Sequence, residues 1–304
     1  MVPYPPGPEP FYRYVSDIVS NWQLSPTKSP IIIGVSGPQG SGKSFAVDQA
    51  VAFLYAQFPH VKVAQMSMDD VYLTHAQQQL LTQKSIEQMD NNRLVQGRGL
   101  PGTHDLELLG DVLHKIRIRD EVAIPRYDKS AFNGEGDRAP RETWTVYTKQ
   151  QAVDVLLFEG WFNGYLAIPD EEMSKRYNAL PADSASKTNT LQHMLQVNDF
   201  LKKYGSVWYR FDYFINFETE DINNVYKWRL QQEHDLIAKR GSGMTDAQVA
   251  SFISRYMAMY EVYYEDLCRS GSLVEDTDSF NIKINLERRV LPITKVSGGI
   301  AFMR

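Results

Sequence analysis

The sequence is poor in cysteine: Cys268 is its only one, so the chain can form no internal disulfide. No apolar run approaches the ~20 residues that a membrane-spanning helix needs. Residues 1–10 are rich in proline and lack the charged and apolar regions of a signal peptide. From these absences we expect a cytoplasmic protein with no membrane partner, and nuclear access stays open.

The chain also lacks an excess of charge of one sign. It has 32 Lys and Arg residues against 37 Asp and Glu residues, a formal net charge of -5. Because nucleic-acid binding needs a basic surface, we expect no nucleic-acid partner. Motifs of other classes are missing as well: the NKxD of GTPases, the LSGGQ of ABC transporters, the HExxH of metal hydrolases and the CxxC of thiol enzymes.

Residues 31–44 read IIIGVSGPQGSGKS, an apolar β-branched run followed by the phosphate-binding P-loop signature. Its glycines let backbone N–H groups wrap a polyphosphate. Lys43 adds a positive charge near the β and γ phosphates, and the Ser44 hydroxyl can ligate Mg²⁺. A chance glycine loop is the alternative, which the apolar strand before it and the helical pattern after it disfavour. We therefore expect a nucleoside triphosphate to bind to Gly37, Pro38, Gln39, Gly40, Ser41, Gly42, Lys43 and Ser44.

Strand and helix patterns alternate behind the P-loop, which predicts an α/β fold: a parallel sheet with helices on both faces, in three layers. Residues 1–24 are predicted to form an extended lead and an amphipathic helix, and residues 25–304 a single domain with an insertion at about 163–187. The other expected elements are strands at 61–68, 152–160 and 213–218, a hairpin of 122–130 with 143–149, helices at about 75–96 and from about 106, 221 and 246, a helix ending near 204, and a closing hairpin at 282–293.

The second predicted strand ends at Asp69 and Asp70. We expect it to neighbour the first strand, so that a carboxylate lies beside the bound phosphates. Phosphoryl transfer to an alcohol needs a group that orients the attacking hydroxyl and accepts its proton, and we assign this role to Asp69. The alternative is that the two aspartates only cap a turn, and this alternative weighs more for Asp70.

Glu159 and Gly160 end the apolar strand at 152–160. An acidic side chain at this position can hold a metal-bound water or polarise the nucleophile, and the glycine leaves room for the phosphates. A strand-end glutamate that caps a neighbouring helix is the alternative. We expect Ser44 and Glu159 to hold Mg²⁺.

Basic side chains in glycine-rich loops predict an anionic acceptor, because such loops commonly carry binding residues. Each cation alone could be a solvated charge, and a lone histidine is more often structural than catalytic. The residues expected to contact the acceptor are Asp70, Tyr72, Arg98, His104, Asp105, Tyr127, Lys129 and Arg138.

The motifs GPQGSGKS, SMDDVYLT, GRGLPGTHD, PRYDKS, FEGW and WRLQQE occur in this order and resemble the D-glycerate 3-kinase family, most of all its fungal branch of ATP-dependent kinases. The resemblance covers roughly residues 30–290, and the chain is more distantly similar to uridine kinase, pantothenate kinase and phosphoribulokinase. It departs from the family at Val71, where phenylalanine is usual, and at the insertion.

The resemblance implies a P-loop kinase fold with a lid arm of helices, Asp69 as catalytic base, and Arg229 in the lid over ATP with Lys239 and Arg240 nearby. The alternative for Arg229 is an i, i+4 side-chain pair with Glu233 on a solvated helix. The resemblance thus implies an ATP- and Mg²⁺-dependent kinase that phosphorylates a hydroxyl of a small anionic metabolite such as glycerate. A nucleoside or pantothenate-type acceptor and a non-catalytic ATP-binding regulator stay open as alternatives.

Overall fold

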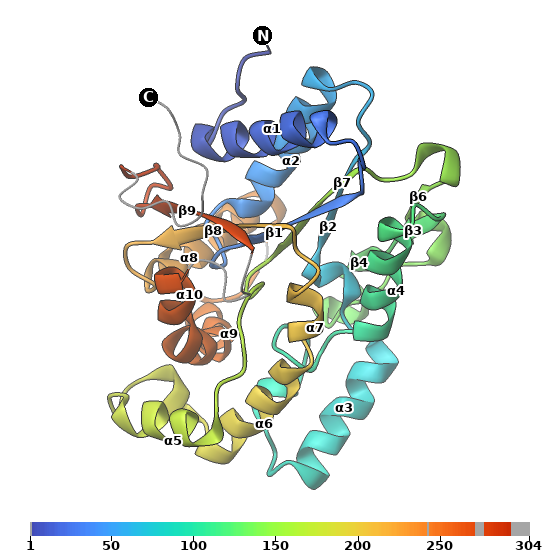
Figure 1. The fold of residues 1–304 in the computed structure, drawn as a ribbon. Helices are drawn as coiled ribbons and strands as arrows, with labels where there is room; N and C mark the ends of the chain where they lie inside the picture. Colours follow the sequence, from blue (N-terminus) through green and yellow to red (C-terminus); the bar gives the residue numbers. More distant parts are fainter. Residues whose placement is uncertain (1, 242, 271–276, 293–304) are drawn as a thin grey trace.

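A five-stranded parallel sheet forms the centre of the molecule (Figure 1). The structure is a computed structural model and describes residues 2–241, 243–270 and 277–292. Its strands are Ile31–Ser36 (β1), Val63–Ser67 (β2), Val155–Gly160 (β7), Tyr213–Thr219 (β8) and Asp278–Ile284 (β9). They follow the order β2-β7-β1-β8-β9, and every neighbouring pair is parallel.

The inner strands β1 and β7 are apolar along nearly their whole length because both of their faces are covered. Ile32 of β1 is fully buried, and so are Leu156, Leu157 and Phe158 of β7. The consecutive apolar runs in the sequence therefore mark the centre of the sheet, and their carboxyl ends position the residues described below.

Helices cover both faces of this sheet. The helices of the described residues are Glu9–Leu24 (α1), Lys43–Gln57 (α2), His75–Gln88 (α3), Leu106–Arg117 (α4), Asp170–Ala179 (α5), Leu191–Lys202 (α6), Gly205–Trp208 (α7), Asn224–Arg240 (α8), Asp246–Met259 (α9) and Glu265–Ser270 (α10). In Figure 1, α1 and α2 lie on one side of the sheet, and α4, α7 and α10 on the other. Phe11 of α1 packs on Phe217 of β8, with ring centroids 5.5 Å apart, so α1 shares the core of the sheet. The predicted three-layer α/β fold is confirmed.

Two short hairpins lie outside the main sheet. Val122–Ile124 (β3) pairs with Thr145–Tyr147 (β6) in antiparallel register, which confirms the predicted hairpin. Within the loop that joins them, Tyr127–Asp128 (β4) pairs with Asp137–Arg138 (β5). This second hairpin brings the loop between β4 and β5 toward the carboxyl end of the sheet.

Two predicted segments differ in the structure. The helix predicted at 75–96 ends at Gln88, because Asp90 and Asn91 adopt left-handed backbone angles with φ of 53° and 54°. The segment 163–187, predicted as irregular, contains helix α5. Only Met173 of this helix is buried, so the sequence shows no apolar helical period there.

The predicted closing hairpin at 282–293 forms in part. Strand β9 joins the main sheet beside β8 in parallel register, and the chain after it returns only as far as one antiparallel bridge between Ile284 and Val290. Residue 293 lies outside the described part of the chain. The alternating apolar residues of this segment are explained by one edge strand of the central sheet.

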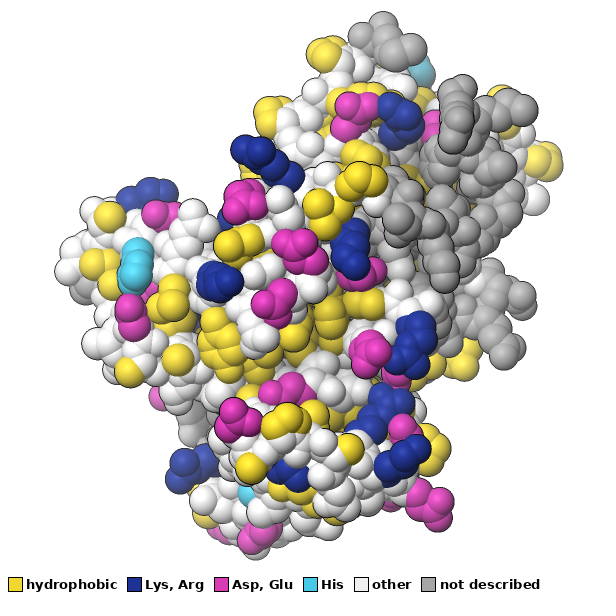
Figure 2. Space-filling model, turned by 90° about the vertical axis from the view of Figure 1, so that its left-hand side faces the viewer, with side chains coloured by type: hydrophobic (Ala, Val, Ile, Leu, Met, Phe, Trp, Pro, Cys, Tyr) yellow, Lys and Arg dark blue, Asp and Glu magenta, His cyan; other side chains and the backbone are white. Residues whose placement is uncertain are grey.

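Two observations concern membrane spans and surface charge, one on the described helices and one on the face drawn in Figure 2. Among the described residues, none of the helices combines the length and apolar composition required to cross a bilayer. The face in Figure 2 carries Lys and Arg side chains interspersed with Asp and Glu side chains, as the balanced composition leads one to expect.

Candidate active site

A cavity of ≈ 390 Å³ lies at the carboxyl ends of β1, β2 and β7. Lys43 and Ser44 line it from the start of α2, Asp69 from the turn after β2, and Glu159 from the end of β7. Because β7 lies between β1 and β2, the prediction that these two strands are neighbours is wrong. The P-loop and Asp69 nevertheless line the same cavity, and the strand that carries Glu159 lies between theirs.

The P-loop is held from outside by three side chains. Gly40 has a φ of +81°, and a Cβ there would lie 2.5 Å from the Cβ of Trp228, so only glycine fits. Arg288 Nε donates a hydrogen bond to the carbonyl oxygen of Gly40 at 2.6 Å, and the backbone N–H of Gln39 donates to the Tyr260 hydroxyl at 3.1 Å. These contacts fix the loop before any phosphate binds.

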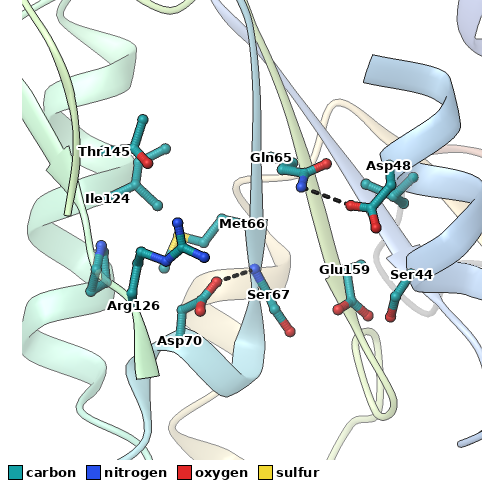
Figure 3. Close-up of a pocket in the computed structure, with 12 residues that line it drawn as sticks. Ser44, Asp48, Gln65, Met66, Ser67, Asp70, Ile124, Arg126, Thr145 and Glu159 are labelled. Atoms are coloured by element: carbon teal, nitrogen blue, oxygen red, sulfur yellow. Dashed lines mark hydrogen bonds between the residues drawn. The ribbon is translucent and has the colours of Figure 1, made fainter. Parts of the chain in front are cut away.

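Ser44 and Glu159 provide the oxygen donors that suit Mg²⁺. Figure 3 shows the Glu159 carboxylate and the Ser44 hydroxyl side by side at the ends of β7 and the P-loop. Lys43 Nζ lies 3.7 Å from Glu159 Oε2, so the Glu159 carboxylate is ion-paired with the lysine that is expected to bind phosphate. A hydroxyl and one carboxylate, completed by phosphate oxygens and water, match the donor set that Mg²⁺ prefers.

Asp69 is paired with a lysine from the loop after β4. Lys129 Nζ donates to Asp69 Oδ2 at 2.5 Å, and the Tyr72 hydroxyl is also hydrogen-bonded to the Asp69 carboxylate. Burial raises the pKa of Asp69, but the Lys129 charge, the two hydrogen bonds and Lys43 together outweigh it and hold this pKa below its usual value. Asp69 is therefore ionised and can accept a proton.

Asp70 lines a different cavity from Asp69 and caps the turn that carries both. Its Oδ2 accepts a hydrogen bond from the backbone N–H of Ser67 at 2.8 Å, and Ser67 Oγ accepts from the N–H of Asp69. Burial raises the pKa of Asp70 to about 6. Asp70 lines a neighbouring cavity of ≈ 270 Å³ together with Arg126, as Figure 3 shows.

Four of the predicted acceptor contacts form a layer around Tyr72. The His104 ring lies 4.7 Å from the Tyr72 ring and the Tyr127 ring 5.2 Å from it, measured between centroids. Arg138 Nη2 donates to Asp105 Oδ2 at 2.9 Å and to the Tyr72 carbonyl at 3.1 Å. These four side chains lie outside the lining of the active-site cavity and hold Tyr72, which lines it.

His104 is a neutral core residue. It is 5% exposed, and its Nδ1 shares a hydrogen bond with the Tyr204 hydroxyl at 2.8 Å. Burial lowers its pKa to about 3. Asp105, the next residue, caps helix α4 by accepting a hydrogen bond from the N–H of Leu108.

Arg98 lines the cavity, but its guanidinium is partly used within the protein. It donates to the carbonyl oxygens of Gly134 at 2.7 Å, of Glu135 and, at 3.4 Å, of Lys129. Arg98 therefore anchors the loop that presents Lys129 to Asp69.

The helix pair α8 and α9 covers the cavity with Arg229. Arg229 Nη2 donates to Glu233 Oε2 at 2.7 Å, so the side-chain pair within one helix that was considered as the alternative is present. Arg229 also lines the cavity. Glu233 is 2% exposed and accepts a second hydrogen bond from the N–H of Met244 at 2.8 Å, which ties α8 to the start of α9.

The sequence did not single out several residues of this site. Arg288 follows β9 and has no motif of its own, and Phe252 and Tyr256 of α9 look like part of an ordinary apolar helix stripe. Trp161 and Gln232 lie within the motifs FEGW and WRLQQE, which was the one available signal. Gly160, expected to leave room for the phosphates, lines the cavity, and the lining beyond the predicted residues comprises Ser67, Trp161, Gln232, Phe252 and Tyr256.

Comparisons with known proteins identify related kinases. No model of a known protein family matches the chain. The protein named "Probable ATP-dependent kinase TDA10" of Saccharomyces cerevisiae is 42% identical over 269 residues, which cover 86% of this chain and 87% of that protein. The chloroplastic D-glycerate 3-kinase of Arabidopsis thaliana is 33% identical over 87% of this chain, which spans 54% of the plant protein. The solved structure of D-glycerate 3-kinase from Cryptococcus neoformans has a TM-score of 0.83 and 30% identity, covering 94% of this chain and 98% of that chain.

Proposed function

This chain belongs to the family of D-glycerate 3-kinases and fungal ATP-dependent kinases and is an ATP-dependent kinase, and from this premise we propose that its acceptor is a small anionic hydroxy acid such as D-glycerate. The observation that carries the proposal is the pairing of Asp69 with Lys129 in the cavity that also contains Lys43. An ionised carboxylate and two ammonium groups there suit an acceptor that has both a hydroxyl and a negative charge.

In the proposed reaction the acceptor oxygen forms a bond to the γ-phosphorus while the bond to the ADP oxygen breaks, and the acceptor proton passes to Asp69. Lys43 holds the phosphates, and Lys129 holds both Asp69 and the acceptor's carboxylate. Arg229 neutralises charge on the transferred group. Ser44 and Glu159 would hold Mg²⁺, which, when bound, neutralises part of the phosphate charge.

The other residues predicted to act on the acceptor fall into two groups, those that contact it and those that position its contacts. Tyr72 and Arg98 line the cavity and would contact the acceptor directly. His104, Asp105, Tyr127 and Arg138 surround Tyr72 and would act by holding it in place, and Asp70 would act by fixing the turn. The remaining P-loop residues Gly37, Pro38, Gln39, Gly40, Ser41 and Gly42 would bind the phosphates of ATP.

Three further predictions belong to this proposal. The cytoplasmic location, the absence of nucleic-acid and membrane partners, and the division of the chain at residue 24 stay predictions.

A nucleoside acceptor is disfavoured by the positive charge of Lys129 and Arg98 in the cavity, whereas a pantothenate-type acid shares the charge of glycerate. A regulator that binds ATP without turnover does not require an ionised Asp69 paired with Lys129.

The experiment is incubation of the protein with Mg·ATP and D-glycerate, pantothenate or uridine in separate reactions, followed by phosphorus NMR of the products. We expect a new phosphomonoester signal with D-glycerate and its loss in a Lys43→Met variant. Phosphorylation of uridine without that of D-glycerate would contradict the proposed acceptor. ATP binding without turnover of any of the three would favour a regulator.

A further inference from the structure

A second cavity, of ≈ 400 Å³, lies beside the candidate active site, between α3, α9 and the loop between β4 and β5. We name it the glutamine cleft, and define it by Gln78, Gln79, Gln96, Arg98, Phe252 and Arg255. Arg98 and Phe252 also line the active-site cavity, so the two cavities share a wall. A ligand that occupies both would pass along these two side chains.

Two buried polar atoms of the glutamine cleft have no hydrogen-bond partner. Gln78 is 7% exposed; its Nε2 donates to the Val95 carbonyl at 2.9 Å, while its Oε1 accepts nothing. Arg255 donates from Nη2 to the carbonyls of Leu94 at 2.9 Å and Gly97 at 3.1 Å, while its buried Nε donates to nothing. Since unpartnered buried polar groups are costly, the Gln78 amide and the Arg255 guanidinium, which both line the cleft, would be stabilised by turning these atoms toward a ligand.

The cleft carries two guanidinium groups, those of Arg98 and Arg255, and one carboxylate, that of Glu135. Within the described part of the chain, neither Arg98 nor Arg255 has a carboxylate within ion-pair distance. Burial, with a smaller contribution from Arg98, lowers the pKa of Arg255, yet a guanidinium stays protonated at neutral pH. The Glu135 carboxylate is hydrogen-bonded to His75 at 2.8 Å and Gln79 at 2.7 Å. The two guanidinium charges exceed this one negative charge, so the cleft favours an anion.

We propose that the glutamine cleft binds the far end of an acceptor larger than D-glycerate: a hydroxylated chain that ends in an anionic group. This proposal rests on the proposed function. The reacting hydroxyl lies at Asp69, the chain passes Arg98, a further hydroxyl donates to Gln78 Oε1, and the anion contacts Arg255. Sugar acids and sugar phosphates share this chemistry.

The first test measures binding to the full chain by isothermal titration, in the presence of Mg²⁺ and a non-hydrolysable ATP analogue. The probes are D-gluconate, D-ribose 5-phosphate, D-glycerate and the uncharged polyol sorbitol. We expect D-gluconate or D-ribose 5-phosphate to bind at least about tenfold more tightly than D-glycerate, since two further polar contacts form, and sorbitol not to bind. The better of the two anions identifies a carboxylate or a phosphate as the terminal group.

The second test uses variants with a matched control. Gln78→Glu places a negative charge in the cleft, and Gln83→Glu places the same charge on the exposed side of the same helix, outside the cleft. We expect Q78E to raise the Kd of the larger anion at least about tenfold and much more than that of D-glycerate, and Q83E to leave both within about twofold. Arg255→Met should have the same effect as Q78E, and Arg255→Lys a smaller one; thermal unfolding identifies any variant that is not folded.

The outcomes separate this proposal from the proposed function. If the protein phosphorylates D-glycerate but neither larger anion binds more tightly, the cleft holds only water and this inference is wrong. An equal effect of Q78E and Q83E would also overturn it. If none of these compounds is phosphorylated or bound, the proposed function itself fails. Turnover of a larger anion that is lost in Q78E and retained in Q83E supports both.

Discussion

Lys129 Nζ lies 2.5 Å from Asp69 Oδ2 and joins the loop after β4 to the end of β2. The Asp69 side chain is 25% exposed, so its burial raises the pKa of the carboxyl while the Lys129 charge lowers it. Lys129 can stay beside Asp69 only if its loop is held in place, and Arg98 holds this loop by donating hydrogen bonds to the carbonyl oxygens of Gly134 and Lys129. The ionisation of the candidate base is therefore controlled by a residue that lies 60 positions away in the sequence.

Removing the Lys129 charge should change the pH dependence of the reaction. In Lys129→Gln, burial still raises the pKa of Asp69 but its principal opposing charge is gone, so this pKa rises. Because the base must be ionised, the acid limb of kcat/KM should move to higher pH, with a larger loss of activity at about pH 5 than at about pH 8.

The conservative variant Lys129→Arg is the control for this experiment. It keeps a positive charge beside Asp69, so the acid limb should stay close to that of the wild type. An acid limb that is the same in both variants would show that Lys129 does not set the ionisation of Asp69. The measurement is kcat/KM against pH with the acceptor that the NMR experiment identifies.

The fold could be predicted from the sequence wherever the pattern was local. The P-loop, the buried strand of Glu159 and the hairpin of β3 and β6 each have a contiguous pattern, and the structure contains them. The order of the strands has no such local signal, so the position of β7 between β1 and β2 was missed. Helix α5 was missed because only Met173 of it faces the core.

The Arg229 pair gives a stability prediction that separates structure from catalysis. Arg229→Met leaves the Glu233 carboxylate buried without its cationic partner, so the free energy of unfolding should fall by about 3 kcal/mol. The double variant Arg229→Met, Glu233→Met should recover part of that loss, because no charge is then buried, although the N–H of Met244 loses its acceptor. If Arg229 also acts on the phosphoryl group, the double variant stays inactive. Urea unfolding and turnover measure the two effects.

An exposed pair of the same spacing provides the control. Arg269 and Glu265 are 2.7 Å apart, with side chains 69% and 85% exposed. Arg269→Met should change the free energy of unfolding by less than about 0.5 kcal/mol, since exposed ion pairs contribute little. Equal losses in Arg229→Met and Arg269→Met would mean that burial of Glu233 is not the cause.

His104 should make the protein sensitive to acid. Its pKa is about 3 in the folded protein, against about 6.5 in an unfolded chain. The unfolded state therefore binds one more proton between these values, and the free energy of unfolding contributed by this group is full above about pH 6.5 and falls by up to about 1.4 kcal/mol per pH unit below it. Urea unfolding at several pH values measures this slope.

Two variants check that the slope belongs to His104. His104→Gln removes the titrating group and should flatten the decline below about pH 6.5. His60, an exposed histidine after α2, is the matched control, and His60→Gln should leave the slope unchanged. A slope that is the same in all three proteins would assign the acid sensitivity to other groups.

The site was predicted less completely than the fold, for a physical reason. Motifs identify side chains near a phosphate, but they do not tell whether a side chain contacts the ligand or its neighbour. His104 and Asp105 share a motif with Arg98, yet they hold Tyr72 and helix α4. Phe252 and Tyr256 reach the cavity only because α8 and α9 pack across it, which is a tertiary relationship without a local sequence pattern.

The most direct test of the account is the Asp69→Asn variant, measured for turnover and for Mg·ATP binding in the same preparation. If Asp69 accepts the acceptor proton, turnover should fall by about 10²–10⁴-fold, while the Kd for Mg·ATP changes by less than about threefold. Turnover that survives in this variant, or an equal loss of turnover and ATP binding, would contradict the assignment of Asp69 as the base.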